Sequence, residues 1–103
     1  MSTPEPGLDR HEWESEHATL EEGLRDDPAQ GLPLLADLVE RMLRERGIDL
    51  QEPDEDELAA EYRAARELSD AAERGEAGPG DVGAAITSLE TIYDALIAAY
   101  SAP

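Results

Sequence analysis

The sequence contains no cysteine, no phenylalanine and no lysine. Without cysteine the chain can form neither disulfides nor thiolate metal sites, and it has no thiol nucleophile. Aromatic residues make up only 4% of the chain, β-branched residues are sparse, and alanine, leucine, glutamate and arginine dominate. These residue types favour helix almost throughout. The composition therefore predicts an all-α protein without strands.

Positive charge is also scarce. Eight arginines oppose 26 acidic residues, so the formal net charge is −18. Nucleic-acid backbones and anionic membrane surfaces are bound by cationic side chains, and this chain would repel both. Residues 1–57 hold 18 of the acids and five of the arginines. We therefore expect an acidic surface, no direct contact with nucleic acid and no membrane partner.

Signals for export are missing from the sequence. The first residues lack the basic start and apolar run of a secretory signal. The most apolar segment, residues 82–100, is long enough to cross a bilayer, but Glu90 and Asp94 lie near its middle. Charged side chains at that depth are costly in lipid. The sequence therefore predicts a cytoplasmic protein.

Apolar spacing divides the chain into four helices that follow a flexible N-terminal tail of residues 1–8. Residues 9–103 are predicted to form a single helical domain. The predicted helices span residues 9–25, 28–46, 54–74 and 81–100. Helices of similar length joined by short connections indicate an all-α four-helix bundle built from two helical hairpins.

Local signals mark the ends of these helices. Asp27 precedes Pro28, which disfavours helical geometry at Asp27 and allows its side chain to cap a new helix. Gly47 is expected to end that second helix. Pro33 inside it removes a backbone donor, which predicts a kink or a separate opening turn. Asp54 is expected to cap the third helix.

The last helix is apolar over more than half of its circumference. A surface helix needs only one apolar stripe, so this helix either lies at the centre of the monomer or packs against a second copy. Thr87, Glu90 and Asp94 remain as a narrow polar strip. The second alternative predicts a homodimer interface formed by Val82, Ile86, Leu89, Tyr93, Leu96, Ile97 and Tyr100.

Candidate metal ligands occur on the first helix. Glu14 and His17 are three residues apart, and Glu21 lies one turn after His17, so all three share one helical face. A Glu-x-x-His pair of this kind is used by carboxylate-bridged di-iron bundles, which need two such pairs. A symmetric dimer would supply the second pair. The competing interpretation is that His17 continues the apolar stripe of Trp13, Leu20 and Leu24.

The sequence contains no motif of an enzyme. The phosphate-binding loop, the nucleophile elbow and a zinc-binding histidine pair are all missing. We therefore expect no catalytic residues and no cofactor. Our first hypothesis for function is a non-enzymatic protein-protein interaction module that self-associates. Two alternatives are an acidic nucleic-acid mimic that binds a basic protein, and a dimeric metal-binding bundle of carboxylates and histidine.

Overall fold

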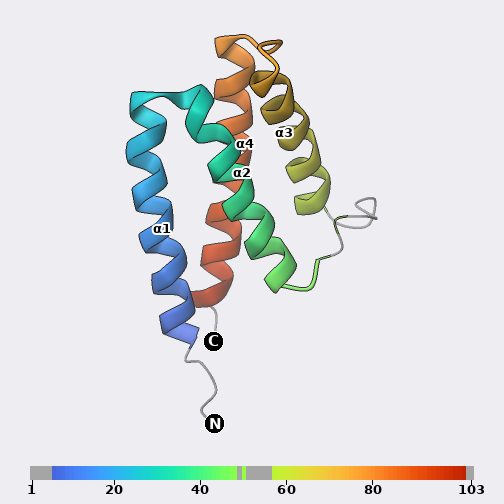
Figure 1. Ribbon diagram of the computed structural model, residues 1–103. Coiled ribbons are helices and arrows are strands. Elements are labelled where there is room, and N and C mark those ends of the chain that lie inside the picture. Colours follow the sequence, from blue (N-terminus) through green and yellow to red (C-terminus); the bar gives the residue numbers. More distant parts are fainter. Residues whose placement is uncertain (1–5, 49, 51–56, 102–103) are drawn as a thin grey trace.

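The computed structural model describes residues 6–48, 50 and 57–101, and the side chains of residues 10–48, 50 and 57–99 (Figure 1). Within these residues the chain is entirely helix, turn and loop, so the predicted all-α bundle is confirmed. The predicted Asp54 cap and residues 1–5 of the predicted tail lie outside the described residues. The four helices are α1 (Pro6–Asp26), α2 (Pro28–Glu45), α3 (Glu57–Glu73) and α4 (Pro79–Ser101).

Most helix ends follow the local signals of the sequence. The Asp27 side chain accepts a hydrogen bond from the backbone N–H of Gln30 at 3.3 Å and caps α2. Gly47 follows the end of α2 with a φ of 80°, a left-handed conformation that glycine adopts without steric cost. α1 begins at Pro6, earlier than the predicted start at residue 9.

α2 continues through Pro33 as one helix, so the separate opening turn, one of the two alternatives predicted for this proline, is absent. The missing N–H of Pro33 leaves the carbonyl of Ala29 without its helical partner. Ala29 is exposed, so water can reach that carbonyl. The cost of the proline is therefore small at this position.

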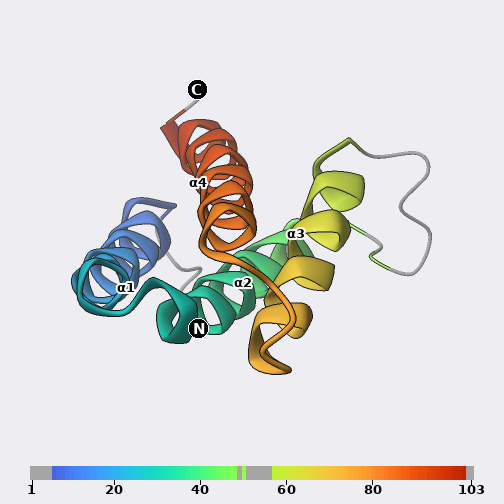
Figure 2. The same cartoon turned by 90° about the horizontal axis from the view of Figure 1, so that it is seen from above.

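α2 is the central helix of the bundle. It packs against all three other helices, α3 also packs against α4, and α1 touches α4 only sparsely. Within the described residues α1 and α3 do not contact each other, and Figure 2 shows them on opposite sides of α2. α1 packs against α2 and α3 packs against α4, and α2 also packs against both α3 and α4. α2 therefore connects the two sequential pairs into one bundle.

The core lies where α2, α3 and α4 meet. α2 contributes the largest share of it, with α4 second, and Tyr62 and Ala65 enter from α3. α1 differs from the other helices, because Leu24 is the single buried side chain among those described in it. Trp13 and Leu20 are only partly buried against this core. The largest fully buried aliphatic side chains are Leu32, Leu35, Leu38, Val39, Met42, Leu43, Leu89, Ile92 and Leu96.

Most of the described residues in the predicted dimer interface on α4 are buried within the protomer. Val82, Leu89, Tyr93 and Leu96 are buried inside the protomer, so they form core rather than an exposed surface. α4 is apolar over a wide arc because it packs against α2 and α3 on broad faces and also touches α1. The side chain of Tyr100 lies outside the described ones. Ile86 and Ile97 are partly buried and pack against the same core.

Residues Pro79–Ala99 of α4 are long and apolar enough to cross a membrane by length and composition alone. The core helix of a water-soluble bundle passes the same test. The buried residues of α4, among them Leu89 and Ile92, account for part of this apolar character.

Candidate metal centre

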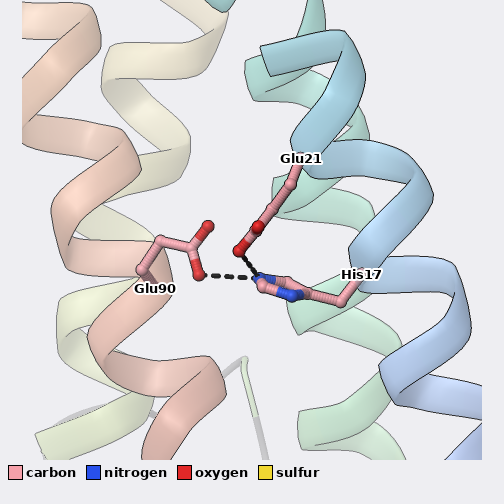
Figure 3. A group of neighbouring side chains, drawn as sticks. All are labelled: His17, Glu21 and Glu90. Atoms are coloured by element: carbon pink, nitrogen blue, oxygen red, sulfur yellow. Dashed lines mark hydrogen bonds and ion pairs between the residues drawn. The ribbon is translucent and has the colours of Figure 1, made fainter. Parts of the chain in front are cut away.

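One histidine and two glutamates converge between α1 and α4, as Figure 3 shows. The Nε2 atom of His17 lies 2.7 Å from Oε2 of Glu90 and 3.4 Å from Oε1 of Glu21. One ligand atom from each residue lies within 4.8 Å of the other two. Two helices that touch only sparsely are therefore joined by three groups that are common metal ligands.

The helical repeat explains how these side chains meet. Glu21 follows His17 by one turn, so both project from the same face of α1. Glu90 belongs to the polar strip of α4, and its side chain points toward His17 on α1. The side chains of His17, Glu21 and Glu90 are 12%, 48% and 28% exposed. The cluster therefore consists of a nearly buried imidazole and two carboxylates that are more exposed to solvent.

The imidazole of His17 has a fixed orientation. Its ring stacks on the ring of Tyr93, with centroids 3.8 Å apart and an angle of 7° between the planes. Tyr93 is buried in α4, one turn of helix from Glu90. Stacking against a buried ring restricts the rotation of the histidine side chain. Nε2 is therefore held toward the two carboxylates.

The electrostatic environment of the cluster is strongly negative. Burial, as the largest cause, and four nearby carboxylates together raise the pKa of Tyr93 to about 12. These carboxylates belong to Glu14, Glu90, Asp94 and Glu21 in order of their effect. A cation at this point would lie in the field of all four.

The donor set fits a divalent transition-metal ion. Imidazole nitrogen suits zinc and its neighbours in the first transition row, and carboxylate oxygen is a common additional ligand. Bonds of about 2.1 Å place tetrahedral ligand atoms about 3.4 Å apart. Glu21 already lies at this distance from His17, and Glu90 would need to withdraw by about 0.7 Å. Three protein ligands leave a coordination position for water.

The sequence located only part of this site. Of the three candidate ligands from the sequence, His17 and Glu21 lie in this cluster, whereas Glu14 lies outside it and pairs with Arg10 at 3.6 Å. Glu90 was missed as a ligand. Its signal was present, because a carboxylate in the middle of an otherwise apolar helix requires a polar partner, but the sequence did not indicate which helix would supply it.

A second polar cluster joins α2 to α3. The Arg66 guanidinium donates to Asp37 at 2.8 Å and to Glu40 at 3.2 Å, and its Nε donates to the Tyr62 hydroxyl at 2.8 Å. Arg44 pairs with Glu40 from the other side at 3.0 Å. Burial opposes the charge of Arg66, but its hydrogen bonds to Asp37 and Tyr62 outweigh this and raise its pKa. Two permanent cations thus balance two carboxylates in this cluster.

Fold and site together define an all-α bundle with a histidine-carboxylate cluster between its first and last helices. Comparison of the chain with protein-family models, curated proteins and solved structures finds no match.

Proposed function

We propose that this protein binds a divalent transition-metal ion, with Zn²⁺ as the reference ion, through His17, Glu21 and Glu90. The observation that carries the proposal is the convergence of one imidazole nitrogen and two carboxylate oxygens from two different helices. The stacking of His17 on Tyr93 supports it, because a ligand that is already oriented loses little freedom on binding. The proposal concerns binding and implies no catalytic reaction.

The chemistry of binding is an exchange of a proton for a metal ion. When Nε2 of His17 carries a proton, it donates that proton to Glu90. A metal ion takes the place of this proton, so the imidazole must be neutral and the glutamates ionised. Metal binding therefore releases protons wherever the metal-free imidazole is charged, and affinity falls as the solution becomes more acidic.

Calorimetric titration of the untagged chain with Zn²⁺ tests this proposal, because a histidine tag would itself bind the ion. The variant Glu90→Gln keeps the size of the side chain and removes its charge. We expect it to lose affinity by at least about tenfold, since even the partners of metal ligands contribute this much. Asp94→Asn is the matched control, because it removes the same charge from the same helix outside the cluster. Its affinity should change by less than about threefold, as expected for screened charges.

Two results would reject the site. Wild-type protein that binds no Zn²⁺ in this titration contradicts the proposal directly. Equal losses in Glu90→Gln and Asp94→Asn would show that the ion responds to the overall negative charge rather than to coordination.

The hypothesis of a self-associating interaction module has less support from α4, because four of the seven residues that motivated it lie in the core. Self-association stays a prediction, and sedimentation equilibrium tests it. The alternative hypothesis of a nucleic-acid mimic rests on the net charge of −18. Capture of partners from a lysate at graded salt tests that hypothesis, which fails if the captured proteins do not bind nucleic acid.

A further inference from the structure

α1 is held on the bundle less firmly than the other helices. Leu24, near its C-terminal end, is its one buried side chain among those described. Toward its N-terminus, α1 is attached by partly buried Trp13 and Leu20 and by polar contacts. Arg41 of α2 lies over the Trp13 ring, 5.7 Å from its centroid, and pairs with Glu16. This half of α1 buries little apolar surface, so polar groups decide whether it stays docked.

Like charges face each other where α1 meets α4. Glu21 on α1 and Glu90 on α4 each have a carboxylate oxygen within 4.8 Å of the other. Carboxylates this close repel each other unless a cation lies between them. His17 is the group within hydrogen-bonding distance of Glu90. It offsets the repulsion only when it is protonated.

We propose that occupancy of the site formed by His17, Glu21 and Glu90 controls the docking of the N-terminal half of α1 on α4. The inference rests on the metal binding proposed above and adds the regulation of that site. A bound ion joins ligands from both helices and neutralises the facing carboxylates. Loss of the ion restores the repulsion and releases this half of α1, which uncovers Tyr93 and the apolar surface beneath Trp13 and Leu20.

The coupling must act in both directions. An ion that binds only the docked state stabilises docking, and any change that weakens docking must weaken ion binding by the same factor. This reciprocity allows a test with a residue that is no ligand. Leu20 packs against the core from α1, and Leu68 packs against it from α3 to a similar partial extent.

Amide hydrogen exchange measures the docking. We expect Zn²⁺ to slow exchange in residues 10–20 by about tenfold relative to the chelated protein, a typical strength for coupled sites. Exchange in α3 should not change. Emission from Trp13, the only tryptophan of the chain, should shift to shorter wavelength on addition of Zn²⁺. A solution of KCl at matched ionic strength should reproduce neither effect.

Variants complete the test. Leu20→Ala should lower the affinity for Zn²⁺ severalfold, within the range of about 5 to 150 that is usual for coupling, whereas Leu68→Ala should leave it unchanged. Helical circular dichroism at the wild-type level confirms that both variants fold. Glu90→Gln should abolish the zinc-dependent protection of α1.

The outcomes separate the two proposals. Zn²⁺ that binds in calorimetry without changing exchange in α1 overturns this inference and leaves the metal site in place. Equal affinities of the Leu20→Ala and Leu68→Ala variants overturn it as well, as does protection of α1 by KCl alone. Failure of Zn²⁺ to bind removes the metal site, and the inference with it.

Discussion

Two polar clusters join helices in this protein, and they differ in the origin of their positive charge. Between α2 and α3, Arg66 lies among Asp37, Glu40 and Tyr62. Between α1 and α4, His17 lies between Glu21 and Glu90, against Tyr93. Each cluster combines a cationic side chain, two carboxylates and a buried tyrosine. The arginine is always charged, whereas the histidine is charged only when protonated.

This difference separates a structural cluster from a candidate binding site. In the α2–α3 cluster the positive charges of Arg66 and Arg44 balance the negative charges of Asp37 and Glu40. The α1–α4 cluster contains two carboxylates, those of Glu21 and Glu90, and their ion-pair partner among the described residues is His17, which carries no permanent charge. A further cation is therefore favoured at the second cluster and not at the first.

The largest effect that we expect is the loss of stability when a core side chain of α2 is truncated, and truncation of a side chain of α1 should cost less. Leu38→Ala removes a fully buried side chain of α2 and should lower the free energy of unfolding by about 2–5 kcal/mol. Leu20→Ala removes a partly buried side chain of α1 and should cost less than about 2 kcal/mol in the metal-free protein. Urea denaturation measures both. Equal costs would show that α1 is as firmly packed as α2.

Loss of the permanent cation should come next. Arg66→Met leaves Asp37 and Glu40 without their shared partner and should lower the free energy of unfolding by about 2 kcal/mol, whether or not Zn²⁺ is present. Arg63→Met is the control, because the exposed Arg63 side chain forms no hydrogen bond or ion pair with the described residues. Its effect should stay within about 0.5 kcal/mol. Similar effects of the two substitutions would contradict the role given to Arg66.

Alkaline pH should weaken the α2–α3 cluster through Tyr62. Burial and the hydrogen bond to Glu40 raise the pKa of Tyr62 to about 12 from the ordinary value of 10.0. The folded state thus favours the protonated phenol. Its contribution to stability is complete below pH 10 and is lost as the pH rises through about 12. Wild-type protein should therefore lose more stability than Tyr62→Phe over this interval, measured by urea denaturation at each pH. Parallel curves would argue against the shift.

The smallest effect should come from the His17–Glu90 pair without metal. A double-mutant cycle with His17→Ala and Glu90→Ala should give a coupling energy of about 0.5–1 kcal/mol at neutral pH, because Glu90 is partly exposed. The coupling should increase when the cycle is repeated with Zn²⁺ above its dissociation constant. A coupling that is the same with and without Zn²⁺ would mean that the pair is only a structural contact.

Short-range features of the fold could be predicted from the sequence because they depend on neighbouring residues. The cap at Asp27 and the turn at Gly47 follow from local backbone chemistry. The pair of Glu40 and Arg44, one turn apart on α2, could be expected for the same reason. The arginine one turn after Asp37 is different. Arg41 lies where it could pair with Asp37 along its own helix, but it pairs with Glu16 of α1.

Only the part of the candidate site that lies on a single helix, α1, could be predicted from the sequence. Glu21 shares a face with His17, and the helical repeat is enough to bring them together. Glu90 is distant in sequence, so its place beside His17 depends on how α4 is rotated against α1. That rotation is set by the burial of Leu89, Ile92 and Leu96, which leaves the Glu90 side chain pointing toward the first helix.

By itself, the sequence determined that the chain is helical, how many helices it forms, where most of them end, and that its charge is strongly negative. These properties arise from local propensity, capping and composition, which act over a few residues. Only the tertiary structure decided that α2 is central, that the apolar face of α4 is used inside the protomer, and that Glu90 meets His17. These features depend on which apolar faces pack together. The free energy gained by packing is roughly proportional to the apolar area removed from water, whatever the order of the helices in the chain.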